Sequence, residues 1–327
     1  MTGLTSLTPA QGARGTRILG TGSFQPDKIV TNDDLAQVMD TSDEWIRDRV
    51  GIIERRAAQP DERLIDMGAA AGRRAVTDAG LAPTDIDTVI VATCTMPTQI
   101  PNASARIADM VGIKGAGAFD LNAACAGFCY AVGTASDLVR GGSARRVLVV
   151  GAERFADWVE RTDRANAIIF ADGAGAAVVG PSDEPAIGPV VWGSAGDLAE
   201  LIYMRDDRWI YQEGQSVFRW ATTQVAPIAL RALELTGLKP SDVDVLIPHQ
   251  ANLRIVSAIA KKLHSEGARD DMIVADDIVY SGNTSSASIP MALDHMRAAG
   301  RVHSGDVLLL VGFGAGLSYA AQVVISP

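Results

Sequence analysis

The chain has 327 residues, a length that fits one large α/β domain or two domains of about 150 residues. Apolar residues make up 47% and charged residues 21%, which is typical of a packed soluble protein and excludes a disordered or collagen-like chain. The net charge of −10 argues against general binding of nucleic acid.

Three cysteines, Cys94, Cys125 and Cys129, are too few for a disulfide framework and predict a reducing, cytoplasmic location. No residues show zinc-ligand spacing, so we expect no metal. The first fourteen residues lack the apolar segment of a secretory signal, so we expect none.

The predicted elements occur twice along the chain. Residues 81–91 resemble residues 238–248 at an offset of 157, and the helices before them match at the same offset. Further on, the apolar strand 147–151 corresponds to a strand at 307–312. Short apolar strands that alternate with helices indicate βαβ units with a buried, largely parallel sheet. We therefore predict two pseudo-symmetric α/β halves.

The C-terminal residues 307–327 carry no charge, as a membrane span would. Three glycines, Gly312, Gly314 and Gly316, interrupt the run, and polar residues follow them. We therefore predict two buried strands around a glycine turn. This turn lacks the spacing of a nucleotide phosphate loop, but its backbone N–H groups could form half of an oxyanion hole.

The repeat predicts where a site would form. Cys125 follows a strand at the start of a helix, and the offset carries it to Gly282, beside Asn283. The same offset carries Cys94 to Ala251, close to His249. Since sites form at the carboxyl ends of strands, we expect Cys125, His249 and Asn283 to converge between the halves.

Each of these residues also has a simpler interpretation. Cys125 is either a nucleophile whose pKa the helix N-terminus lowers or a buried structural cysteine. His249 fits a satisfied buried histidine as well as a site residue, and Asn283 fits a turn or helix cap. We expect Cys94 and Cys129 to be core packing.

Two basic clusters contrast with the acidic total. One surrounds Trp45, and the other places Arg254, Lys261 and Lys262 on one face of a predicted helix. Each cluster fits either a solvent-exposed helix face or a binding surface for phosphates or an acidic carrier protein.

Five motifs in this order resemble β-ketoacyl-acyl-carrier-protein synthase III, in its actinobacterial branch. They are Thr41-Ser-Asp-Glu-Trp-Ile46, Ala123-Ala-Cys-Ala-Gly-Phe128, Pro248-His-Gln-Ala-Asn-Leu-Arg254, Gly282-Asn-Thr-Ser285 and Gly312-Phe-Gly-Ala-Gly-Leu-Ser-Tyr319. The resemblance implies a thiolase-like fold, a layered α-β-α-β-α structure. The first half, 1–182, would carry the cysteine, and the second, 183–327, the histidine and asparagine.

The resemblance also implies a reaction. Cys125 would take an acyl group from acyl-CoA as a thioester. His249 and Asn283 would then stabilise the enolate formed when malonyl-acyl-carrier protein loses carbon dioxide, and the enolate would attack the acyl group. Backbone N–H groups of Cys125 and Ala315 would form the oxyanion hole. A neutral His–Asn pair suits this step because it holds negative charge without protonating the carbanion.

Other residues match binding positions of the family. Those implied to bind CoA are Trp45, Arg49, Arg164, Gly214 and Asn252; those implied to dock carrier protein are Arg219, Arg254, Lys261 and Lys262; and those implied to line the acyl pocket are Ile100, Phe170 and Phe313. Ile100 would act across a homodimer. The resemblance implies no cofactor besides the substrate acyl-CoA, no membrane insertion and a cytoplasmic enzyme of fatty acid or polyketide synthesis.

Some positions depart from the family pattern. Ala165-Asn-Ala follows Arg164 where glycine is common, and the segment 196–214 is shorter than usual. Acyl preference therefore stays open. The alternatives are acyl transfer to an alcohol or amine without condensation, and a silent partner subunit, although such subunits usually lose the cysteine.

Overall fold

Two five-stranded sheets organise the chain in this computed structural model, which describes residues 10–327. The first sheet has the order β1 (Gly15–Phe24), β7 (Asp172–Ser182), β6 (Val147–Arg154), β4 (Thr88–Ala92) and β5 (Gly117–Leu121). The second has the order β8 (Val191–Gly193), β14 (Tyr319–Ile325), β13 (Val307–Phe313), β11 (Val245–Pro248) and β12 (Ile273–Val274). In each sheet the last three strands run parallel and the first two pair antiparallel, so the sheets share one topology.

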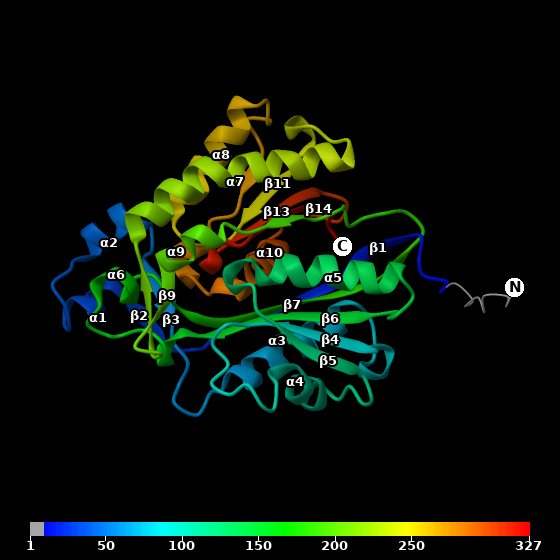
Figure 1. Cartoon of the computed structure of the whole chain (residues 1–327), viewed down its shortest axis with the longest axis horizontal. Helices are drawn as coiled ribbons and strands as arrows, with labels where there is room; N and C mark the ends of the chain where they lie inside the picture. The colour runs from blue at the N-terminus through cyan, green and yellow to red at the C-terminus, as the bar shows by residue number, and fades with distance from the viewer. Residues whose placement is uncertain (1–9) are drawn as a thin grey trace, which may run out of the picture.

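Helices cover both sheets and separate them (Figure 1). Helices α5 (Gly127–Arg140) and α10 (Ser288–Ala298) lie between the sheets. Helices α3 (Leu64–Asp78) and α4 (Ala103–Val111) cover the outer face of the first sheet, and α7 (Gly214–Thr236) and α8 (Leu253–Ser265) cover that of the second. This gives the layers α-β-α-β-α and confirms the predicted thiolase-like class.

The strand sequences explain the buried sheets. Residues 147–150 of β6 and 308–311 of β13 are apolar and fully buried, as expected for strands covered by helices on both faces. The repeated segments form β4 and β11, which occupy equivalent places in the two sheets. A Cβ at Gly151 would lie 2.4 Å from the Ser286 carbonyl oxygen, so glycine lets β6 approach the turn after Asn283.

Smaller elements surround one end of the layers. They are β2 (Ile29–Thr31), α1 (Asn32–Ala36), α2 (Asp43–Val50), β3 (Glu54–Arg56), α6 (Arg164–Ala167), the hairpin β9 (Ile202–Arg205) and β10 (Trp209–Gln212), and α9 (Ile278–Ser281). Helix α2 begins where the Ser42 hydroxyl accepts a hydrogen bond from the Trp45 N–H, and it ends at Gly51 in the left-handed conformation.

The uncharged C-terminal segment forms β13 and β14, as predicted. Among residues 10–327, no helix has the length and apolar character that crossing a membrane requires. A division at 182/183 stays a prediction; β7 ends at Ser182, and β8 of the second sheet begins at Val191. Residues 1–9, part of the segment considered for a secretory signal, lie outside the described residues.

Candidate active site

One cavity of about 310 Å³ collects the predicted reactive residues from both halves. Cys125, His249 and Asn283 all line it. Its other lining residues include Cys94, Phe155, Trp158, Phe170, Tyr203, Met204, Ile210, Phe313 and Ala315. The repeat therefore located these three residues at one place, between the two sheets.

Cys125 lies in a single 3-10 turn, Ala124–Ala126, directly before α5. Ala124 has φ of 46°, a left-handed conformation that a non-glycine residue adopts only under strain. A Cβ at Gly314 would lie 2.7 Å from the Cys125 Cβ, so the glycine turn approaches the thiol closely. Burial raises the pKa of the Cys125 thiol to about 12, although a hydrogen bond with Ser285 opposes the rise. The lowered pKa that the nucleophile interpretation of Cys125 included is therefore not found, and burial is the main cause of the rise.

His249 follows β11 and is buried, with 2% of its surface exposed. Burial lowers the pKa of its imidazole to about 3, so the ring is neutral near pH 7. Its Nδ1 lies 2.7 Å from the Ser288 hydroxyl, which also accepts a hydrogen bond from the Gln250 N–H. The Ser288 hydroxyl has one hydrogen to donate, and with that hydrogen on Nδ1 the imidazole proton resides on Nε2. The cavity thus receives a neutral N–H donor.

The amide of Asn283 is oriented by its own turn. The Asn283 backbone pairs with Ile169 and Ala171, and its side-chain Oδ1 accepts a 2.8 Å hydrogen bond from the Ser285 N–H. Because the oxygen is engaged, the amide nitrogen is left to donate. Asn283 and His249 together supply two neutral donors and no carboxylate, an arrangement that stabilises an oxyanion or enolate.

Backbone donors complete the site. Cys125 and Ala315 each lie in the first turn of a 3-10 segment, where a backbone N–H has no acceptor within its helix. Phe313 packs edge-on against the His249 ring at 5.3 Å, and Phe170 stacks on Phe155 at 4.4 Å. Both Phe170 and Phe313 line the cavity as expected.

Ile100 does not reach the cavity of its own chain. Its side chain is 89% exposed in the loop before α4, on the surface of the first half. Any contribution to an acyl pocket would therefore come from a second copy, and this role stays a prediction.

A second cavity of about 430 Å³ adjoins the first. All five residues predicted to bind CoA line it: Trp45, Arg49, Arg164, Gly214 and Asn252. The Trp45 ring lies 5.5 Å from the Arg49 guanidinium and 4.8 Å from that of Arg164. The two cavities share Gln212, Val217, Ala251 and Asn283. They thus form one path from a cationic, aromatic mouth to the thiol, which suits a long substrate with an anionic end.

The residues predicted to dock carrier protein lie on the outer helices. Arg219 is on α7, while Arg254, Lys261 and Lys262 are on α8, and all four are exposed. Lys262 forms a 2.5 Å ion pair with Glu266, which partly neutralises it. Arg254 lies over the Phe218 ring and also lines the second cavity.

Sequence reasoning missed several residues. Cys94 is not core packing: it is half-buried and lines the first cavity, whereas Cys129 is fully buried as expected. The repeat carried a signal for this, since it matched Cys94 to Ala251, another cavity residue. The β9–β10 hairpin lies within the segment 196–214, which departs from the family pattern, but sequence reasoning did not identify its cavity residues Tyr203, Met204 and Ile210. Within residues 10–327, no group of three or more His, Cys, Asp or Glu side chains could hold a metal ion.

The fold and the cavity define an acyltransferase of the condensing type. The family described as "3-Oxoacyl-[acyl-carrier-protein (ACP)] synthase III" matches residues 119–196, and its C-terminal part matches residues 233–325. The chain therefore belongs to the 3-oxoacyl-[acyl-carrier-protein] synthase III family.

Individual relatives agree with this assignment. The chain is 49% identical to β-ketoacyl-[acyl-carrier-protein] synthase III 4 of Streptomyces coelicolor, covering 96% of this chain and 99% of the relative. It is 45% identical to the mycobacterial β-ketoacyl-[acyl-carrier-protein] synthase III of Mycobacterium avium, covering 98% of each. The priming β-ketosynthase of the R1128 polyketide pathway superposes with a TM-score of 0.95 at 43% identity, covering 99% of each chain.

Proposed function

We propose that this chain condenses an acyl-CoA starter with malonyl-acyl-carrier protein, with loss of carbon dioxide, to initiate fatty acid or polyketide synthesis. The observation that carries the proposal is the single cavity that brings the Cys125 thiol together with two neutral side-chain donors and two backbone donors. No cofactor enters this proposal, because the acyl-CoA substrate supplies the activated group.

In the first half-reaction, the Cys125 sulfur attacks the acyl-CoA carbonyl, and CoA leaves as a thiolate that takes a proton from water. Backbone N–H groups of Cys125 and Ala315 hold the oxyanion. The nucleotide end of CoA lies at Trp45, Arg49 and Arg164, in the second cavity.

In the second half-reaction, His249 Nε2–H and the Asn283 amide donate to the malonyl thioester carbonyl. Carbon dioxide departs, and the two donors hold the enolate. The enolate carbon attacks the acyl-Cys125 carbonyl, and the product leaves on the carrier protein. Since neither donor is charged, neither readily protonates the carbanion.

The proposal includes a cytoplasmic homodimer. Two exposed apolar side chains, Ile100 at 89% and Phe119 at 39%, support an interface on the first half. Phe119 belongs to β5, an edge strand whose backbone groups favour coverage by a partner. Light scattering at micromolar concentration tests the dimer.

Intact mass spectrometry tests the reaction. Incubation with a panel of acyl-CoAs should produce an adduct on the protein, and malonyl-carrier protein should discharge it as β-ketoacyl-carrier product with release of carbon dioxide. The acyl group that reacts fastest identifies the starter. An adduct that only an alcohol or amine discharges would instead indicate acyl transfer without condensation.

Ser288→Ala should slow condensation by about tenfold, the effect of one lost hydrogen bond of about 1.4 kcal/mol. Without this hydroxyl, His249 Nδ1 loses its donor, and both imidazole tautomers become populated. Nitrogen NMR of the imidazole should report the mixture, while the acylation rate changes little. Ser288→Thr, which keeps the hydroxyl, is the control. An unchanged tautomer in the Ala variant would contradict this role.

Lys261→Glu should raise the KM for malonyl-carrier protein several-fold at low salt and leave the KM for acyl-CoA unchanged. Lys261 is exposed on α8 and lines neither cavity, so its charge acts only on docking. Lys239→Glu, beyond the C-terminal end of α7, is the control for a charge change alone. Equal KM changes in the two variants would exclude a specific docking face.

A further inference from the structure

Glu153 is a fully buried carboxyl group that the proposed reaction does not use. It lies near the end of β6, with 0% of its surface exposed. Its Oε2 accepts hydrogen bonds from the Thr95 hydroxyl at 2.5 Å, the Cys94 N–H at 3.1 Å and the Thr93 hydroxyl at 3.2 Å. Within residues 10–327 it forms no ion pair, and burial raises its pKa. A buried carboxyl without a cation has a pKa above its ordinary value, so it takes up a proton more readily than a solvated carboxyl does.

The partners of Glu153 accommodate both protonation states. The Ser286 hydroxyl lies 2.8 Å from Glu153 Oε1 and 2.8 Å from the Ala92 carbonyl oxygen, but it has one hydrogen. When Glu153 is ionised, this hydroxyl donates to the carboxylate. When Glu153 is protonated, the carboxyl donates to Ser286, which donates to Ala92. Neither state leaves a buried carboxyl oxygen without a partner.

A chain of hydrogen-bonding groups leads from Glu153 to the reactive thiol. The Cys94 sulfur lies 3.4 Å from Glu153 Oε1 and 3.8 Å from the Ser285 hydroxyl. Ser285 in turn lines the same cavity as Cys125, and the 3-10 turn that it opens packs against the turn that carries the thiol. Each member of this chain can donate one hydrogen toward Glu153 and accept one from the Cys125 side.

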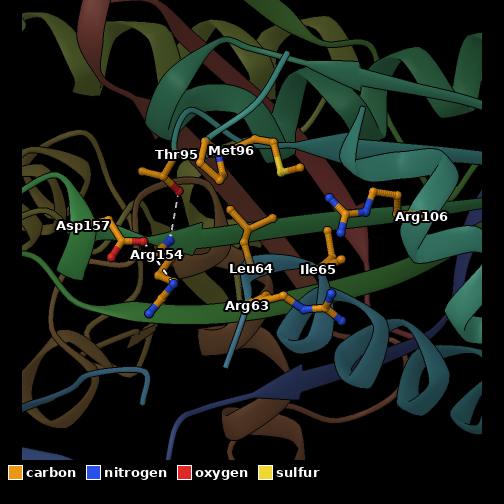
Figure 2. Close-up of a pocket in the computed structure, with 9 residues that line it drawn as sticks. Arg63, Leu64, Ile65, Thr95, Met96, Arg106, Arg154 and Asp157 are labelled. Carbon is orange, nitrogen blue, oxygen red and sulfur yellow. Dashed lines mark hydrogen bonds and ion pairs between the residues drawn. The ribbon is translucent and has the colours of Figure 1, made fainter. Parts of the chain in front are cut away.

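The carboxyl itself is held in place by the Thr95 hydroxyl. The Thr95 hydroxyl accepts a 2.9 Å hydrogen bond from the Arg154 N–H, so its hydrogen points at Glu153 (Figure 2). Figure 2 shows Thr95 and Arg154 at a small cavity of about 90 Å³, which the Arg63 and Arg106 side chains also line. Arg154 interacts there with Asp157 at 3.1 Å. The positive charge of Arg154 is therefore paired with Asp157 and not with Glu153.

We propose that Glu153 holds the proton of the Cys125 thiol during the acylated stage of the cycle, exchanging it through Cys94 and Ser285. This inference rests on the proposed condensation. In acylation, the S–H bond of Cys125 breaks as its sulfur forms a bond to the acyl carbon. The proton shifts along the chain to Glu153, and CoA leaves as a thiolate that takes a proton from water.

The second half-reaction returns the proton. The enolate carbon bonds to the acyl carbon and the C–S bond to Cys125 breaks. The released thiolate then takes a proton along the reverse path, and Glu153 is ionised again. Glu153 takes up one proton and releases it again in each turnover. The overall reaction also consumes one proton from water, which CoA takes up, and releases carbon dioxide.

No other group near the thiol is suited to this task. His249 is neutral but has the weak basicity that burial imposes, with a pKa of about 3. Glu153 and Cys125 face each other, and Cys94 faces both of them. Burial raises the pKa of the Cys94 thiol well above its usual range. Glu153 is thus the one carboxyl that acts on the Cys125 thiol among the described residues.

Glu153→Gln tests the relay, because an amide can take the place of the carboxyl in its hydrogen bonds but cannot accept a proton near neutral pH. Its oxygen can accept from Thr93, Thr95 and Cys94, and its NH₂ can donate to Ser286. We expect the melting temperature to change little and the single-turnover acylation rate to fall about 100-fold near pH 7. The wild-type rate should rise with pH and level off above the pKa of Glu153. In the Gln variant the rise should move into the alkaline range of the thiol.

Variants along the chain separate the relay from packing. Cys94→Ala should slow acylation as Glu153→Gln does, while Cys94→Ser, which restores a donor and acceptor, should recover most of the rate. Cys129→Ala removes a fully buried thiol that lies outside the chain, and it should acylate at the wild-type rate. Wild-type rates and pH profiles in both Glu153→Gln and Cys94→Ala would overturn the relay. Absence of any adduct in the wild-type protein would instead refute the proposed function.

Discussion

Cys125→Ala is expected to abolish the acyl-enzyme. The cavity then retains its donors but has no nucleophile at the end of the path from the second cavity, so no thioester forms at this position. Condensation should fall by at least about 1,000-fold, since the step that depends on the covalent intermediate is lost. Intact mass after incubation with acyl-CoA measures the adduct directly. Slow decarboxylation of malonyl-carrier protein should persist, because His249 and Asn283 remain in place.

Cys129→Ala is the matched control for the loss of a thiol. Cys129 lies one helical turn further along α5 and is fully buried, so the variant should lose stability but keep the adduct. The cavity also holds a second thiol, Cys94. An adduct that persists in Cys125→Ala and maps to Cys94 would contradict the assignment of the nucleophile, and peptide mapping distinguishes the two.

The internal repeat made most of the fold predictable. Residues 88–91 and 245–248 form equivalent strands because the same apolar run is buried in each sheet. Strand ends at one edge of a sheet also bring distant residues together, which is why the offset located His249 and Asn283 beside Cys125. Local patterns therefore sufficed wherever the site depends on strand ends.

The environment of the thiol could not be predicted in the same way. Glu153 acquires its partners from the end of β4 and from the turn after Asn283, segments far apart in the sequence. The raised pKa of Cys125 likewise follows from burial by surrounding segments, which no local motif records. The ion pair of Lys262 could not be predicted either. Helical spacing predicts that Lys262 is exposed, but its pairing with Glu266 depends on the side-chain rotamers.

The two sheets also explain why the site tolerates strain. Ala124 in the left-handed conformation would cost stability in an isolated turn. In this structure the turn is followed by α5 and contacts Gly314, which comes directly after the buried strand β13. The packed layers hold the nucleophile in a geometry that the local sequence disfavours. A side chain at position 314 would therefore displace the thiol rather than fill empty space.

Asn283→Ala should separate the two half-reactions. Acylation of Cys125 uses the backbone donors, so its rate should change little, whereas condensation should fall about 100- to 1,000-fold, the effect of removing one oxyanion donor. Asn283→Asp is the sharper variant, because a carboxylate oxygen still accepts from the Ser285 N–H and the turn is preserved. It replaces the donated hydrogen with negative charge, which repels the enolate. Condensation should therefore be lower in the Asp variant than in the Ala variant.

The measurement is the mass of the protein at two stages. In both variants the adduct should form with acyl-CoA at close to the wild-type rate and then persist after malonyl-carrier protein is added. Phe170→Leu is a control at the same cavity wall, since it changes packing beside Asn283 without removing a donor; it should alter the preferred acyl chain but still discharge. Equal loss of acylation and condensation in Asn283→Ala would mean that the residue only supports the turn. An Asp variant that discharges as fast as wild type would show that the amide does not hold the enolate.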